Sequence, residues 1–235
     1  TNFYFTFAGP NIGFDGQGFT VTINNVSNFN GLFRNGTFPT TNGQANITIK
    51  NLGVKSSGST TLNESAGWVC QLYFGREAAN NRIENCYSLG AISGSRSGGI
   101  CGEGAALGKS GSLTIEYCYS TGAISGLNAG GICGMGAASS GGTVTVTNCY
   151  SEGVISGKAT AGICGSFAGS GSGSNVTVSK CYSRGNITYV GSSSGSGGIA
   201  VSLNATASGA QGISIGDGSD AIGTGGVAIG QNAQA

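Results

Sequence analysis

The sequence predicts an all-β protein folded as a parallel β-solenoid, and three observations support this. All eight cysteines fall into two columns of one repeat: Cys86, Cys118, Cys149 and Cys181 are 32, 31 and 32 residues apart, and Cys70, Cys101, Cys133 and Cys164 are 31, 32 and 31 apart. Short runs of Val, Ile and Thr alternate with glycines that favour turns. Helices are disfavoured because 47 of the 235 residues are glycine, each costing about 1 kcal/mol inside a helix. Each repeat of about 31 residues is therefore predicted to form one coil with about three short strands.

Residues 1–66 are predicted to form an N-terminal cap followed by irregular coils. Phe3, Tyr4, Phe5 and Phe7 form an uncharged aromatic run that favours a β-strand. Such a strand would pair with other chains if it were left exposed. We expect it to be buried either as the cap of its own solenoid or by strand addition to another subunit. Residues 14–23 also resemble the opening coil of pectate-lyase-like β-helices.

Residues 67–199 are predicted to form a regular solenoid. The run Asn85-Cys86-Tyr87-Ser88-Leu89-Gly90-Ala91-Ile92-Ser93-Gly94 and the shorter Gly99-Ile100-Cys101-Gly102 both recur in the later repeats. These motifs resemble the GLUG repeats of bacterial surface proteins. The resemblance implies a right-handed β-solenoid in adhesins and other exposed proteins, and it implies no reaction. This chain departs from the family by placing cysteine in the shorter motif.

Residues 200–235 are predicted to form a small β-roll or assembly segment. Gly212-Ile213-Ser214-Ile215-Gly216 and Gly226-Val227-Ala228-Ile229-Gly230 are 14 residues apart. This period resembles the head repeat of trimeric autotransporter adhesins and implies a homotrimer or a similar lateral assembly. The alternative is a solenoid end that tapers off. The predicted assembly residues are Phe3, Tyr4, Phe5 and Phe7 at one end and Ile213, Ile215, Val227 and Ile229 at the other.

The composition disfavours several classes of function. The net charge is +1, only 8% of residues are charged, and the basic residues are scattered, so no nucleic-acid footprint is expected. No apolar run approaches the roughly 20 residues that span a membrane. The chain has no histidine, which removes Ser-His and Cys-His nucleophiles and imidazole ligands. No cofactor and no metal site is expected.

The cysteines and the acidic residues are interpreted as structural. Two ladders of buried thiols are the preferred interpretation of the cysteines, and bridges within a coil, such as Cys86 to Cys101, remain open. Glu84 and Glu116 share a column and are the one candidate pair for glycoside hydrolysis. Surface decoration is the favoured interpretation of that pair.

These observations predict a structural subunit of a fibre or filament that self-assembles through its termini. The expected location is extracellular, at a cell surface or on a virion or other particle. The first alternative is an adhesin that binds a glycan or host protein through loops 103–112 and 135–142, which differ between coils. The second alternative is a β-helix enzyme that degrades polysaccharides.

Overall fold

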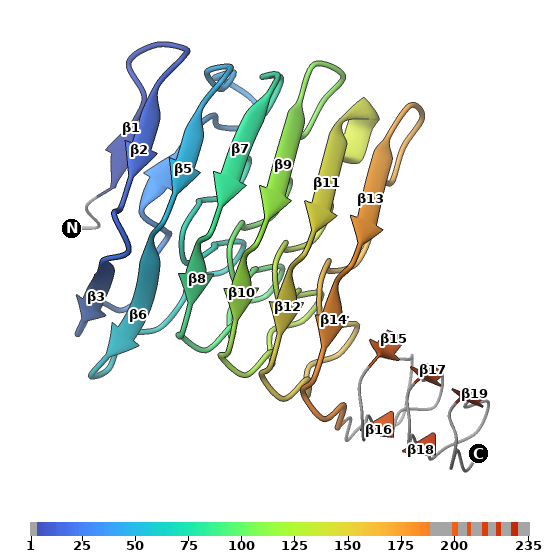
Figure 1. Cartoon of the computed structure of the whole chain (residues 1–235). Coiled ribbons are helices and arrows are strands. Elements are labelled where there is room, and N and C mark those ends of the chain that lie inside the picture. Colours follow the sequence, from blue (N-terminus) through green and yellow to red (C-terminus); the bar gives the residue numbers. More distant parts are fainter. Residues whose placement is uncertain are drawn as a thin grey trace.

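The protein is a parallel β-solenoid of six stacked coils, as the sequence predicted (Figure 1). The computed structural model describes residues 4–188 and, beyond them, the backbone of five short strands between residues 199 and 229. Successive coils stack side by side from the N-terminal end toward the C-terminal end, and each coil contributes one strand to each of two six-stranded sheets. Apart from these strands and the short strands at the two ends of the chain, the described chain forms turns, single β-bridges and one 3₁₀ turn, Ser139–Gly141.

The two sheets consist of strands that are paired in parallel along the stack. The first sheet contains, in spatial order, β2 (Gly13–Asp15), β5 (Thr48–Lys50), β7 (Asn81–Glu84), β9 (Ser112–Glu116), β11 (Thr143–Thr147) and β13 (Asn175–Ser179). The second sheet contains β3 (Thr20–Asn24), β6 (Gly53–Ser57), β8 (Tyr87–Ser88), β10 (Tyr119–Ser120), β12 (Tyr150–Ser151) and β14 (Tyr182–Ser183). Both sheets run without interruption from the irregular coils into the regular ones.

The third side of each coil differs from the expected third strand. It is held by single parallel bridges, which join Cys70, Cys101, Cys133 and Cys164 in one column and Ile92, Ile124, Ile155 and Ile187 in another. The flanking residues are mostly glycine and serine, which have low strand propensity. The pairing is therefore limited to one residue per coil at these positions.

The core is a set of ladders in which equivalent side chains stack from coil to coil. The register of the first sheet places Phe14, Ile49, Ile83, Ile115, Val146 and Val178 in one column. The four inner members of this column are fully buried. The coils lengthen toward the N-terminus: Thr143 pairs 31 residues back with Ser112, whereas Thr48 pairs 35 residues back with Gly13. The predicted period is thus confirmed for the regular coils and is longer in the irregular ones.

A left-handed turn joins the two sheets in each coil after the first. Its residue has a positive φ of 55°, 49°, 52°, 52° and 53° at Asn51, Asn85, Tyr117, Asn148 and Lys180, respectively. Asparagine tolerates this region better than most residues. The side-chain amide of Asn85 donates to Oδ1 of Asn51 at 3.3 Å, so the asparagines also bond along the stack.

The second sheet and the bridged side of each coil lie close together, and only small side chains separate them. Ser88, Ser120 and Ser151 are fully buried, and a Cβ placed on Gly99 would lie 2.7 Å from Cβ of Ser120. The same Cβ would lie only 2.0 Å from the carbonyl oxygen of Gly131 in the next coil. Glycine is therefore required at Gly99 for the coils to approach each other.

Short strands continue at the two ends of the chain. β1 (Phe5–Thr6) pairs with β4 (Phe33–Arg34) at the N-terminal end. At the other end β15 (Ile199–Val201), β17 (Ile213–Ile215) and β19 (Val227–Ile229) form one parallel sheet, and β16 (Thr206–Ala207) pairs with β18 (Asp220–Ala221). Ile213 pairs with Val227 and Ile215 with Ile229, so the predicted 14-residue period is present in the backbone.

Candidate functional site

The N-terminal end of the solenoid is the first candidate site, because core columns become exposed there. β1, β2 and β3 are the terminal strands of their sheets, and their outer edges pair with no other strand in the described part of the chain. Phe5 is 57% exposed and Phe19 is 72% exposed. Val21 is 37% exposed although it begins a column whose next members, Val54 and Ser88, are fully buried. We call this surface, formed by β1, β2, β3 and the exposed side chains beside them, the N-terminal edge. Its apolar side chains are exposed because no further coil covers them.

The predicted aromatic strand packs on its own solenoid without being fully covered. The ring of Phe5 lies 5.5 Å from that of Phe33 and 6.0 Å from that of Phe14. Tyr4, which is 42% exposed, accepts a hydrogen bond of 3.0 Å from Nη1 of Arg34. Phe7 packs against the core and Phe3 lies outside the described residues. The strand thus covers part of the first coil and leaves one edge of its own open.

In the part of the chain that the structure describes, the first sheet also ends without a further strand beyond β13. Val178 of β13 is 47% exposed, whereas Val146, its neighbour in the same column, is fully buried. The side chains of Ile213, Ile215, Val227 and Ile229 lie outside the described residues, so their role in assembly stays a prediction.

The cysteines form two columns of free thiols inside the stack. Six of the eight are buried, and Cys164 and Cys181 near the C-terminal end are partly exposed. The backbone N–H groups of Cys86 and Cys118 lie 3.4 Å from the sulfur atoms of Cys118 and Cys149, respectively. Burial raises the pKa of the Cys70, Cys101 and Cys118 thiols, which keeps them protonated and unreactive at neutral pH.

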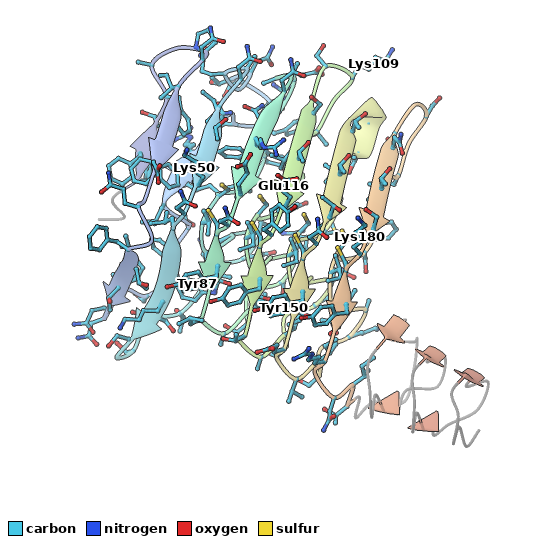
Figure 2. The ribbon with its side chains drawn as sticks, in the orientation of Figure 1. Lys50, Tyr87, Lys109, Glu116, Tyr150 and Lys180 are labelled. Carbon is cyan, nitrogen blue, oxygen red and sulfur yellow. The ribbon has the colours of Figure 1, made fainter. Side chains whose placement is uncertain are left out.

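A ladder of tyrosines runs along the outside of the second sheet. The rings of Tyr87, Tyr119, Tyr150 and Tyr182 stack at centroid distances of 5.0, 4.9 and 5.1 Å, with planes within 5° of parallel. The labelled Tyr87 and Tyr150 of this ladder lie on strands of the same row (Figure 2). Arg184 lies over the last ring at 4.8 Å. The rings contact one another through their faces, which is the arrangement of a stabilising ladder.

The two carboxylates proposed for hydrolysis are joined by a cation. Glu84 and Glu116 are register partners, as the spacing predicted, and Arg82 forms an ion pair with both. The guanidinium therefore takes the position between the carboxylates that a glycosidic bond would need. This arrangement is a surface ion-pair network.

A groove on the bridged side brings together residues that sequence reasoning mostly missed. It has a volume of about 420 Å³ and is lined mainly by aromatic residues, small residues and one carboxylate, including Phe38, Tyr73, Glu103, Met135 and Phe167. Glu103 and Met135 begin the two loops that the sequence predicted as a binding face. The missed residues Tyr73 and Phe167 lie three positions after Cys70 and Cys164, so the repeat could have revealed them. Phe38 lies on a loop outside the repeat and carried no such signal.

Comparisons with known proteins give no family for the chain. No protein-family model matches it, and no curated protein or solved structure was found to match. The resemblances to GLUG repeats and to autotransporter heads therefore stay predictions. In the described residues no helix is long and apolar enough to cross a membrane. Nor does that part of the chain group three His, Cys, Asp or Glu side chains where they could hold a metal ion.

Proposed function

We propose that the protein is a structural β-solenoid subunit of a fibre or filament at an extracellular, cell or particle surface, and that copies join end to end. The observation that carries this proposal is the N-terminal edge. There the columns of the core, buried in every inner coil, end in exposed side chains such as Phe19 and Val21.

The edge strands lack the lysine and proline residues that often keep edge strands from pairing. β1, β2 and β3 contain no lysine and no proline, and their one charged residue, Asp15, is held by Lys50 at 3.4 Å and by Asn51 at 3.0 Å. Natural proteins protect long open edges with such residues because unpaired N–H and C=O groups recruit other strands. A second copy is the partner that fits this edge in strand direction and coil spacing.

Stacking of one copy on another would continue both the sheet and its core column. Placed beyond β13, the β2 strand of a second copy would set its Phe14 against Val178, the exposed last member of that column. This contact joins different surfaces of the two copies, and repetition of such a contact produces an open filament. Lateral association through residues 209–235 would add to the same assembly.

The test is electron microscopy and sedimentation of the chain with Val21→Lys, which places a charge in the open column. We expect filaments of the unaltered protein and shorter or absent filaments of this variant. Val154→Lys is the matched control, because Val154 is 44% exposed on the side of an inner coil. Monomeric rods for the unaltered protein, or equal assembly of both variants, would contradict the proposal.

A further inference from the structure

We propose that the groove beside Phe38, Tyr73 and Phe167, here called the aromatic groove, is a binding site for a neutral saccharide. Its volume of about 420 Å³ lies in the range of small-molecule sites. The proposal is independent of end-to-end assembly, because the N-terminal edge contributes no residue to the groove.

The groove exists because one column of the repeat changes its residue type. Tyr73, Gly104, Gly136 and Phe167 occupy equivalent positions, each three residues after a bridged cysteine, and have φ values of 59°, 65°, 69° and 61°. The two outer members are aromatic and the two inner members are glycine. With a coil spacing of about 4.8 Å, the Cα atoms of the outer members are about 14 Å apart. The glycines therefore form a floor between two aromatic walls.

The walls present aromatic surface to the groove. Phe167 is 66% exposed and Phe38 is 57% exposed. The ring of Phe38 lies 5.6 Å from that of Tyr73, and Tyr73 leans over the floor, since a Cβ on Gly104 would lie 2.5 Å from its Cδ1. Exposed rings of this kind supply the apolar contact that the C–H face of a sugar ring needs.

Polar groups for sugar hydroxyls stand beside these rings. The side chain of Glu103 is held in place because its Oε2 accepts the Ser65 hydroxyl at 2.5 Å and pairs with Nε of Arg96 at 3.2 Å. Tyr73 and Glu103 lie next to each other, since the backbone N–H of Tyr73 donates to the Glu103 carbonyl at 2.7 Å. Burial and then the Glu103 carboxylate raise the pKa of Tyr73. Ser139, whose hydroxyl donates to the Gly136 carbonyl, adds a further acceptor at the floor.

The charges favour a neutral ligand over an anion or an organic cation. The lining residues include no lysine or arginine, so an anion would find no charged partner among them. Glu103 is the lining carboxylate, and it is already paired with Arg96. A cation would also compete with Arg76, whose guanidinium lies 5.6 Å from the ring centre of Phe38. What remains is a ligand with apolar faces and uncharged hydroxyls.

The experiment is isothermal titration of the full chain with a panel of neutral oligosaccharides built from glucose, N-acetylglucosamine, xylose and galactose. Tetramethylammonium and a sulfated oligosaccharide serve as charged probes. We expect saturable binding of at least one neutral member, weakened about tenfold by Phe167→Ala and by Phe38→Ala, because one aromatic contact is worth that much. Phe19→Ala, which removes an equally exposed ring outside the groove, should bind as the unaltered protein does.

Circular dichroism and filament formation would verify that the groove variants fold and assemble. Three outcomes would overturn the proposal: no neutral saccharide binds, the affinity is unchanged in both groove variants, or a charged probe binds more tightly than every neutral one. Loss of assembly in Phe19→Ala with binding intact would leave the saccharide site standing and concern the N-terminal edge alone.

Discussion

The buried serine column offers a test in which two identical substitutions should have opposite effects on stability. Ser120 and Ser151 are fully buried neighbours in this column. The Ser151 hydroxyl donates to the Ser183 hydroxyl at 2.9 Å, whereas the Ser120 hydroxyl has no hydrogen-bond partner. A buried hydroxyl without a partner costs about 1–3 kcal/mol, and a made hydrogen bond contributes about 1 kcal/mol. Ser120→Ala should therefore stabilise the protein by about 1 kcal/mol, and Ser151→Ala should destabilise it by about as much.

Thermal unfolding followed by circular dichroism would measure the difference. For a domain of this size 1 kcal/mol corresponds to about 2–4 °C, so the two variants should melt about 4–8 °C apart. Because stacked coils can unfold in stages, amide exchange of the two neighbouring coils would verify where the change occurs. Destabilisation of Ser120→Ala would refute the reasoning, since it would mean that this hydroxyl bonds along the ladder as Ser151 does.

Three further predictions concern the turn column, the thiols and the surface ion pairs. Tyr117→Asn should stabilise the protein by about 1 kcal/mol in chemical unfolding, because asparagine tolerates the left-handed turn that tyrosine occupies at a cost. Leu89→Asn, which lies outside that column, should give no gain in stability. Thiols with a raised pKa, such as Cys101 and Cys118, stay protonated in the fold while unfolded thiols ionise near pH 8.5. The free energy of unfolding should thus fall above that pH by up to about 1.4 kcal/mol per unit and per thiol. Reaction of the buried Cys101 or Cys118 in the native protein with Ellman's reagent at pH 8, located by peptide mapping, would contradict this, whereas reaction of the partly exposed Cys164 or Cys181 would not. Arg82→Gln should lower the free energy of unfolding by about 0.5–1 kcal/mol at low salt and by less at high salt, because it leaves two stacked carboxylates without their cation. Equal melting temperatures of the variant and the unaltered protein at low salt would argue against the network.

The arrangement of the columns could be predicted from the sequence because a solenoid turns a linear period into a spatial contact. The 31- and 32-residue spacings placed each cysteine beside its equivalent, and the same spacing placed Glu84 beside Glu116. What the spacing could not predict is where a side chain reaches within its own coil. Arg82 lies two residues before Glu84, and its position between two carboxylates depends on the rotamers of three side chains.

The irregular coils were harder to predict for a physical reason. Phe38 lies on a loop that has no equivalent in the regular repeats, so no period indicated that its ring would meet Tyr73. About three short strands were predicted in each coil, but the side that carries Gly99 and Cys101 is held by single bridges, because glycine has low strand propensity and the backbones of neighbouring coils approach closely there. Periodicity predicts which residues are neighbours, and local sterics decide how many of them pair.

The same reasoning separates structural positions from candidate functional ones. In a stack of equivalent coils, a column that repeats one residue type, such as the tyrosines or the buried serines, is explained by contact with its own copies. A column that loses its side chains in the inner coils cannot be explained in this way. The change from Tyr73 to Gly104 and Gly136 and then to Phe167 removes side chains from the middle of a ladder and creates the aromatic groove. The ends of the stack are the other places where a column lacks a neighbour, and Val21 and Val178 are exposed for that reason. Both proposals therefore rest on positions where the repeat fails to cover its own core.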